Sequence, residues 1–150
     1  MARFHYSMQS ILNIKLKMES QAKQEFSAAR ANLDKENECL AALVHRKEAY
    51  EREAADLLSG ILNVKAIEEN KMAVLCMEDY ISKQQLKVDQ AEQLLEEARE
   101  RLTQVMVERK THETLREKAF EQFRQEEKKN EGKEVDELTS YTYGQKKKDL

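Results

Sequence analysis

Apolar residues recur every three and four positions along most of the chain, and this spacing constrains the fold more than any other feature. Counted from Met8 to Leu57, the heptad a and d positions number fifteen, of which eleven are apolar. A second series from Ile67 to Val105 has ten apolar residues at twelve positions. Repeats sustained over this many heptads predict two coiled-coil helices.

A short segment separates the two series. Gly60 can take the left-handed conformation that ends a helix, and Asn63 can cap the helix that follows. We therefore predict an all-α fold, a long two-helix antiparallel coiled-coil hairpin that occupies residues 1–150 as one domain. The expected bounds are about 4–59 for helix 1, 60–63 for the turn, about 64–131 for helix 2, and 132–150 for a short C-terminal tail.

The composition agrees with a thin core between two helices. Of the 150 residues, 37% are charged and 40% hydrophobic, and the chain has three Gly and no Pro. Turn residues are too few for a sandwich or an α/β fold, and apolar side chains are too few for a thick core.

Beyond Val105 the apolar frame weakens. Its next positions are Arg109, His112 and Arg116, while apolar residues still recur at three- and four-residue spacing. We predict a stutter near residues 108–112, a local shift of the repeat. The apolar residues that indicate the shift are Leu115, Ala119, Phe120 and Phe123.

No residue pattern indicates catalysis, a cofactor or a metal. His5, His45 and His112 are scattered, and no catalytic or phosphate-binding motif surrounds them. Cys39 and Cys76 stand alone, which predicts reduced, buried or half-buried thiols in a cytosolic protein. An elongated hairpin also has no enclosed pocket for a substrate, so we expect no enzyme.

The charge pattern and hydropathy argue against two other partners. The net charge is −3 with alternating signs, which disfavours nucleic acid. No run of 18 apolar residues and no signal peptide is visible, so we expect no direct membrane insertion and a cytoplasmic location.

The N-terminus resembles a known family. The segment Phe4-His5-Tyr6-Ser7-Met8-Gln9-Ser10-Ile11-Leu12-Asn13-Ile14-Lys15 is similar to the opening F-x-Y-x-[LM]-Q-x-[VI]-L-x-[IL]-K of the FliJ family of flagellar export proteins. Three weaker similarities follow in the family's order, at residues 80–81, 108–118 and 133–138. The length and the two-helix plan agree over the whole chain.

The resemblance implies a stalk-like coiled coil in flagellar type III protein export. It would bind the hexameric export ATPase and a membrane export gate protein, would lie at the cytoplasmic face of the cell membrane, and is also thought to handle export chaperones. By resemblance, the ATPase-contact candidates are Phe4, Tyr6, Arg109, Lys110, Arg116, Lys118, Asp136 and Glu137. The gate-contact candidates, in the distal half of the hairpin, are Leu43, Tyr50 and Tyr80.

Two other functions fit the same periodicity. One is a general structural or adaptor coiled coil that associates with itself. The other is the equivalent stalk protein of a virulence type III secretion system or of a rotary ATPase. Residues 4–15 favour the flagellar system over these two. Each charged candidate can also be explained without a partner, as a residue on a solvent-exposed helix face.

Overall fold

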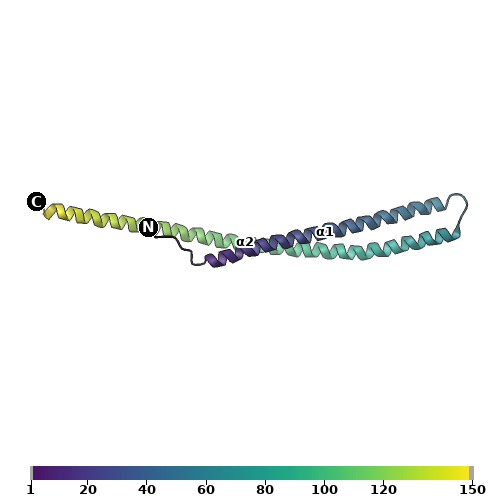
Figure 1. Ribbon diagram of the computed structural model, residues 1–150, viewed down its shortest axis with the longest axis horizontal. Helices are drawn as coiled ribbons and strands as arrows, with labels where there is room; N and C mark the ends of the chain where they lie inside the picture. Colours follow the sequence, from purple (N-terminus) through teal and green to yellow (C-terminus); the bar gives the residue numbers. More distant parts are fainter. Residues whose placement is uncertain (1, 149–150) are drawn as a thin grey trace. The chain divides into compact units, whose positions relative to one another are not determined.

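A computed structural model describes residues 2–148 of the protein. These residues form two long helices (Figure 1). Helix α1 spans Gln9–Leu57 and helix α2 spans Val64–Lys148. Phe26 contacts Arg99, and Glu36 contacts Gln84. Later residues of α1 therefore contact earlier residues of α2, so the helices are antiparallel. The predicted all-α, antiparallel two-helix fold is confirmed.

The turn between the helices forms as the sequence predicted. Gly60 is the one described residue with a positive φ, at 84°, a conformation that side chains with a Cβ rarely adopt. The backbone N–H of Ala66 donates to the side-chain oxygen of Asn63 at 3.3 Å, so Asn63 caps α2. At the other helix end, the hydroxyl of Ser59 donates to the carbonyl oxygen of Asp56 at 2.7 Å.

The helix bounds differ from the prediction at both termini of the chain. Helix α1 begins at Gln9, not near residue 4, and residues 2–8 form a non-helical lead. Helix α2 continues to Lys148, so the predicted end near 131 and the tail over 132–150 are wrong for the described residues. Gly132 and Gly144 are helical because a glycine costs only about 1 kcal/mol relative to alanine, which its helix-forming neighbours offset.

The chain divides into two compact units. Unit 1 contains residues 1–19 and 105–150, and unit 2 contains residues 20–104. In unit 2 the most buried side chains are Ala22, Val88 and Ala91. In unit 1 the buried apolar residues are Tyr6, Leu12 and Val105.

The predicted heptad frame describes the burial well. Every frame position from Leu12 to Leu57 and from Ile67 to Val105 is buried or half-buried. Beyond Val105 the side chains of Arg109, His112, Ala119 and Phe123 follow the same frame and are half-buried, but Arg116 of that frame is exposed. Leu115 and Phe120, which suggested the shift, are exposed.

The prediction that the two thiols are buried or half-buried is also wrong. Cys39 and Cys76 are both exposed. Each lies outside the a and d positions of its helix, so the helical phase turns the thiols away from the seam between the helices.

Candidate functional site

The N-terminal lead of unit 1 packs onto α2 through an aromatic cluster. The ring of Phe4 lies 5.1 Å from that of Phe120, edge to face, and 5.4 Å from that of Phe123, between ring centroids. The guanidinium carbon of Arg116 lies 5.7 Å from the centre of the Phe4 ring. Tyr6 is buried, and its hydroxyl has no hydrogen-bond partner among the described residues. Phe4 therefore attaches the lead to α2.

Arg109, a predicted ATPase contact, lies in the seam of unit 1. Its Nε donates to the carboxylate of Glu19 at 2.5 Å, and its Nη1 donates to Glu113 at 2.8 Å. These hydrogen bonds, that of Glu19 first, raise the pKa of Arg109 above its ordinary value. Glu19 is buried, with 6% of its surface exposed, so the ion pair with Arg109 offsets part of the cost of burying its carboxylate.

Two further polar contacts connect the helices of unit 1. The ammonium of Lys15 donates to Glu108 at 2.9 Å. The Nε of Arg116 donates to the side-chain oxygen of Gln9, also at 2.9 Å. Arg116 thus contacts both Gln9 and Phe4, and its side chain holds the start of α1 and the lead beside α2.

The other two basic candidates face solvent. Lys110 and Lys118 are exposed and border a shallow groove of about 380 Å³ on the surface of α2. Val107 and Leu115, both exposed, line the same groove. This groove combines apolar contact area with two cations, an arrangement that suits an amphipathic partner with acidic side chains.

The acidic candidates lie on the last part of α2. Asp136 and Glu137 are exposed and helical, although the sequence predicted a tail there. Glu137 borders a shallow groove of about 370 Å³ together with Leu138 and Tyr141. All eight predicted ATPase contacts therefore belong to unit 1.

The three gate candidates belong to unit 2 and differ in exposure. Leu43 and Tyr50 are half-buried at seam positions, and the carbonyl oxygen of Tyr50 accepts a 2.9 Å hydrogen bond from the side chain of Asn70. Tyr80 is 52% exposed and lies beside the seam. Tyr80 has the freest side chain of the three.

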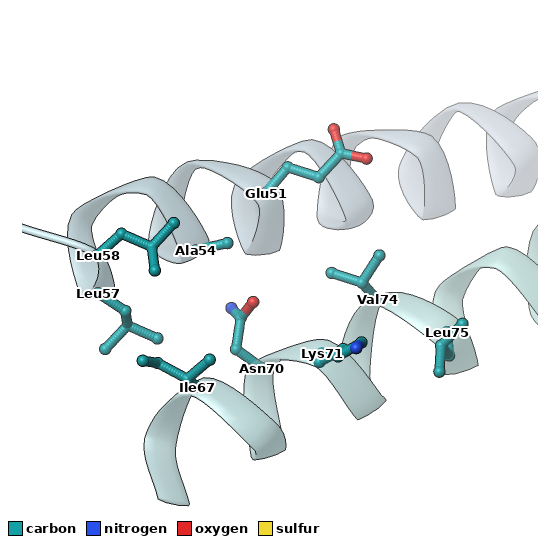
Figure 2. A pocket seen from close by; sticks show the side chains of 9 residues that line it. All are labelled: Glu51, Ala54, Leu57, Leu58, Ile67, Asn70, Lys71, Val74 and Leu75. Atoms are coloured by element: carbon teal, nitrogen blue, oxygen red, sulfur yellow. The ribbon is translucent and has the colours of Figure 1, made fainter. Parts of the chain in front are cut away.

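A cavity of about 440 Å³ lies between α1 and α2 near the turn, and the sequence did not predict it (Figure 2). Ile67, Asn70 and Val74 point from α2 toward α1, as Figure 2 shows. None of the predicted gate residues lines this cavity. Its walls are formed by Glu51, Ala54, Leu57, Leu58, Ile67, Asn70, Lys71, Val74 and Leu75.

A sequence signal for this end of the hairpin was present. Leu58, Ile61, Leu62 and Val64 place large apolar side chains in and beside a turn, where polar residues are usual. All four are exposed.

Neither a metal site nor a membrane-spanning helix occurs among residues 2–148. Within residues 2–148, no three His, Cys, Asp or Glu side chains are grouped so that they could hold a metal ion. Neither helix, over the same residues, is long and apolar enough to cross a membrane.

Comparison with known proteins gives two similarities. A search of curated proteins gives no match. A solved structure of a putative YscO homolog, CT670, from Chlamydia trachomatis is similar with a TM-score of 0.79 and 21% sequence identity, covering 99% of this chain and 100% of that one. At this identity the similarity concerns the fold. The family model described as the flagellar FliJ protein matches residues 4–148. Because this match extends over nearly the whole chain, the protein belongs to the FliJ family.

Proposed function

We propose that this protein is a non-enzymatic, stalk-like coiled coil that couples the hexameric flagellar export ATPase to a membrane export gate protein. As a FliJ family member, it is a component of flagellar, type III protein export. The coupling role, the two partners and a position at the cytoplasmic face of the cell membrane go beyond family membership. Handling of export chaperones, which the sequence resemblance implies, belongs to the same proposal.

One observation carries the proposal for the ATPase. Two of the segments that resemble the family, residues 4–15 and 108–118, contact each other in unit 1. Three contacts connect these parts of the chain: Phe4 with Arg116, Gln9 with Arg116, and Lys15 with Glu108. Segments nearly a hundred residues apart thus form one surface, as a shared binding site requires.

The contacts divide the ATPase candidates into two roles. Lys110 and Lys118 are exposed and free to approach a partner's carboxylates. Arg109 pairs with Glu19 and Glu113, so its role is to position the helices. Phe4 has a similar positioning role, because it packs the lead onto α2, and Tyr6 is buried within unit 1.

Unit 2 is the part of the protein that would bind the membrane export gate protein. Tyr80 offers an exposed aromatic ring, which binding interfaces favour. The cavity near the turn adds an apolar recess in the same unit. Leu43 and Tyr50 support this contact from the seam, where they are half-buried.

The ATPase contact is tested with a double charge reversal, Lys110→Glu with Lys118→Glu. Both lysines are exposed, so the helices should form as before, and ATPase binding in a pull-down should fall roughly tenfold. Lys35→Glu with Lys87→Glu is the matched control, since it makes the same charge change on exposed positions of unit 2. Arg109 is unsuitable for this test, because its replacement would also break an internal ion pair.

The outcome separates the proposed functions. Loss of ATPase binding in the first variant alone supports a contact through unit 1. Equal loss in both variants would mean that net charge, rather than this surface, drives binding. If the folded wild-type chain captures neither ATPase nor gate protein, the coupling role is wrong and a structural coiled coil within the export apparatus replaces it.

A further inference from the structure

The last part of α2 is exposed on all sides. Phe4 of the lead packs against α2 at Phe123, and every side chain from residue 128 to residue 146 is exposed. The segment also contains Gly132 and Gly144, and a glycine is about 1 kcal/mol less favourable in a helix than an alanine. Most helical stability in proteins comes from the packing of one face, so a partner would stabilise this segment.

One face of the segment carries apolar side chains at helical spacing. Val135, Leu138 and Thr142 are three and four residues apart and border a shallow groove of about 390 Å³. Val135 is 60% exposed and Leu138 is 65% exposed. The seam between α1 and α2 has a different phase, because its frame would continue at Lys133 and Glu137. Val135, Leu138 and Thr142 therefore form a separate terminal face, with the spacing of a short coiled-coil contact.

The charges on the two sides of the terminal face have opposite signs. Residues 131–137 contain four carboxylates and one lysine, whereas residues 146–148 are all lysine. No charged residue occurs from 138 to 145. The segment thus has an acidic part, an uncharged centre and a basic part, in that order.

This order of charges favours a second copy of the chain as the partner. A two-fold axis near residue 140 would place the acidic part of each copy beside the basic part of the other. Leu138 of one copy would then lie opposite Thr142 of the other, so the apolar faces would meet at the uncharged centre. A parallel pair would instead place like charges side by side, and a lipid bilayer would offer no positive partner to the acidic part.

We propose that the terminal face is the interface of a weak, antiparallel dimer of this chain. The proposal goes beyond the coupling function, since it concerns the protein without the ATPase and the gate protein. Two helical segments of this length bury less than the roughly 1,200 Å² that stable complexes require. We therefore expect a monomer at low micromolar concentration and a dimer at hundreds of micromolar, in sedimentation equilibrium of the full-length protein.

The first variant tests the apolar centre. Leu138→Asp should weaken self-association at least about tenfold, because it places two carboxylates in the middle of the interface. Leu86→Asp is the matched control, since Leu86 is on the same helix, is 63% exposed and lies in unit 2. Circular dichroism of both variants checks that helix content is preserved.

A pair of charge variants tests the second copy directly. Glu131→Lys with Glu134→Lys makes both charged parts basic, and Lys146→Glu with Lys147→Glu makes both acidic. Each variant alone should self-associate at least about tenfold more weakly than the wild type, because like charges meet. An equimolar mixture of the two should associate again, because opposite charges meet.

Engineered cysteines test the direction of the pair, in a chain with Cys39→Ser and Cys76→Ser. In the antiparallel pair, Val135 of one copy lies opposite Gln145 of the other and about 15 Å along the axis from its own counterpart. A disulfide requires Cα atoms within about 7 Å. Val135→Cys and Gln145→Cys should therefore cross-link efficiently when mixed in a glutathione redox buffer, and neither should do so alone.

Three results would overturn the proposal. In the first, the wild type stays monomeric at hundreds of micromolar, and loss of ATPase capture in Leu138→Asp would then assign the face to the ATPase. In the second, both charge variants self-associate as the wild type does, which would place the contact elsewhere. In the third, Val135→Cys alone cross-links efficiently, which would make the pair parallel. None of these results bears on Lys110 and Lys118, whose contact the pull-down tests separately.

Discussion

The seams of the two units differ in chemistry although they belong to the same pair of helices. In unit 1 the residues that connect the helices include Lys15, Glu19 and Arg109, which form ion pairs. In unit 2 the most buried residues are apolar, and the buried Asn70 and Gln84 donate to backbone carbonyl oxygens across the seam. Unit 2 therefore depends mainly on apolar burial, whereas unit 1 depends more on charge pairing.

One coiled coil can therefore contain regions of unequal stability. Buried apolar area contributes about 25 cal/mol per Å² without any geometric requirement. A charge pair gains little unless its partners stay aligned and shielded from water. We expect unit 2 to be the more stable region, and unit 1 to open more readily.

The largest effect is expected from Met77→Ala in unit 2. Met77 is 7% exposed at a seam position, so truncation should lower the free energy of unfolding by about 2–3 kcal/mol. Met72→Ala is the matched control, because Met72 is on the same helix and 61% exposed. Urea denaturation followed by circular dichroism compares the two, and similar losses would contradict the apolar seam of unit 2.

A smaller effect is expected from Glu19→Ala in unit 1. The change leaves Arg109 with Glu113 alone and should lower the free energy of unfolding by about 1–2 kcal/mol, because a buried charge pair is broken. The control is Glu96→Ala, whose exposed carboxylate is 3.7 Å from Arg99 within α2. Hydrogen exchange should locate the loss at residues 105–118, and a loss spread evenly over both units would argue against separate seams.

The smallest effect concerns Lys83, on the outer surface of unit 2. A 3.0 Å hydrogen bond to Asp79 and the charge of that carboxylate raise the pKa of Lys83 above its ordinary value of 10.5. The pair's contribution to stability is present below the unfolded pKa and is lost as pH rises through the folded pKa. In an NMR titration, Asp79→Asn should return the pKa of Lys83 to its ordinary value while leaving the stability at neutral pH almost unchanged.

The heptad pattern predicted which face of each helix is buried, and the structure agrees even at polar positions. Glu36 and Gln84 illustrate this, because both lie on the frame and hydrogen-bond to each other across the seam. The positions of Gly60 and Asn63 likewise predicted the turn. These features depend on helical periodicity and local backbone preferences, which are properties of the sequence itself.

The candidate site was less predictable. The sequence made both Arg109 and Lys110 candidate ATPase contacts, because both are basic residues of a segment that resembles the FliJ family. In the structure Arg109 is paired in the seam, whereas Lys110 faces solvent. One step along a helix turns a side chain by about 100°, so adjacent residues can have opposite surroundings. The charge of a residue therefore did not predict whether it was available to a partner.

Helical periodicity and local backbone preferences were enough to predict the two helices, their antiparallel arrangement and the turn, and the N-terminal motif indicated the family. The packing of the folded chain set the contacts of Phe4 with Phe120 and Phe123 and of Arg109 with Glu19, and it formed the cavity beside the turn. It also decided that α2 continues to Lys148 and that Ile61 remains exposed. Periodicity specifies the face that a residue occupies, but its contacts depend on which side chains the opposite helix and the N-terminal lead bring to that face.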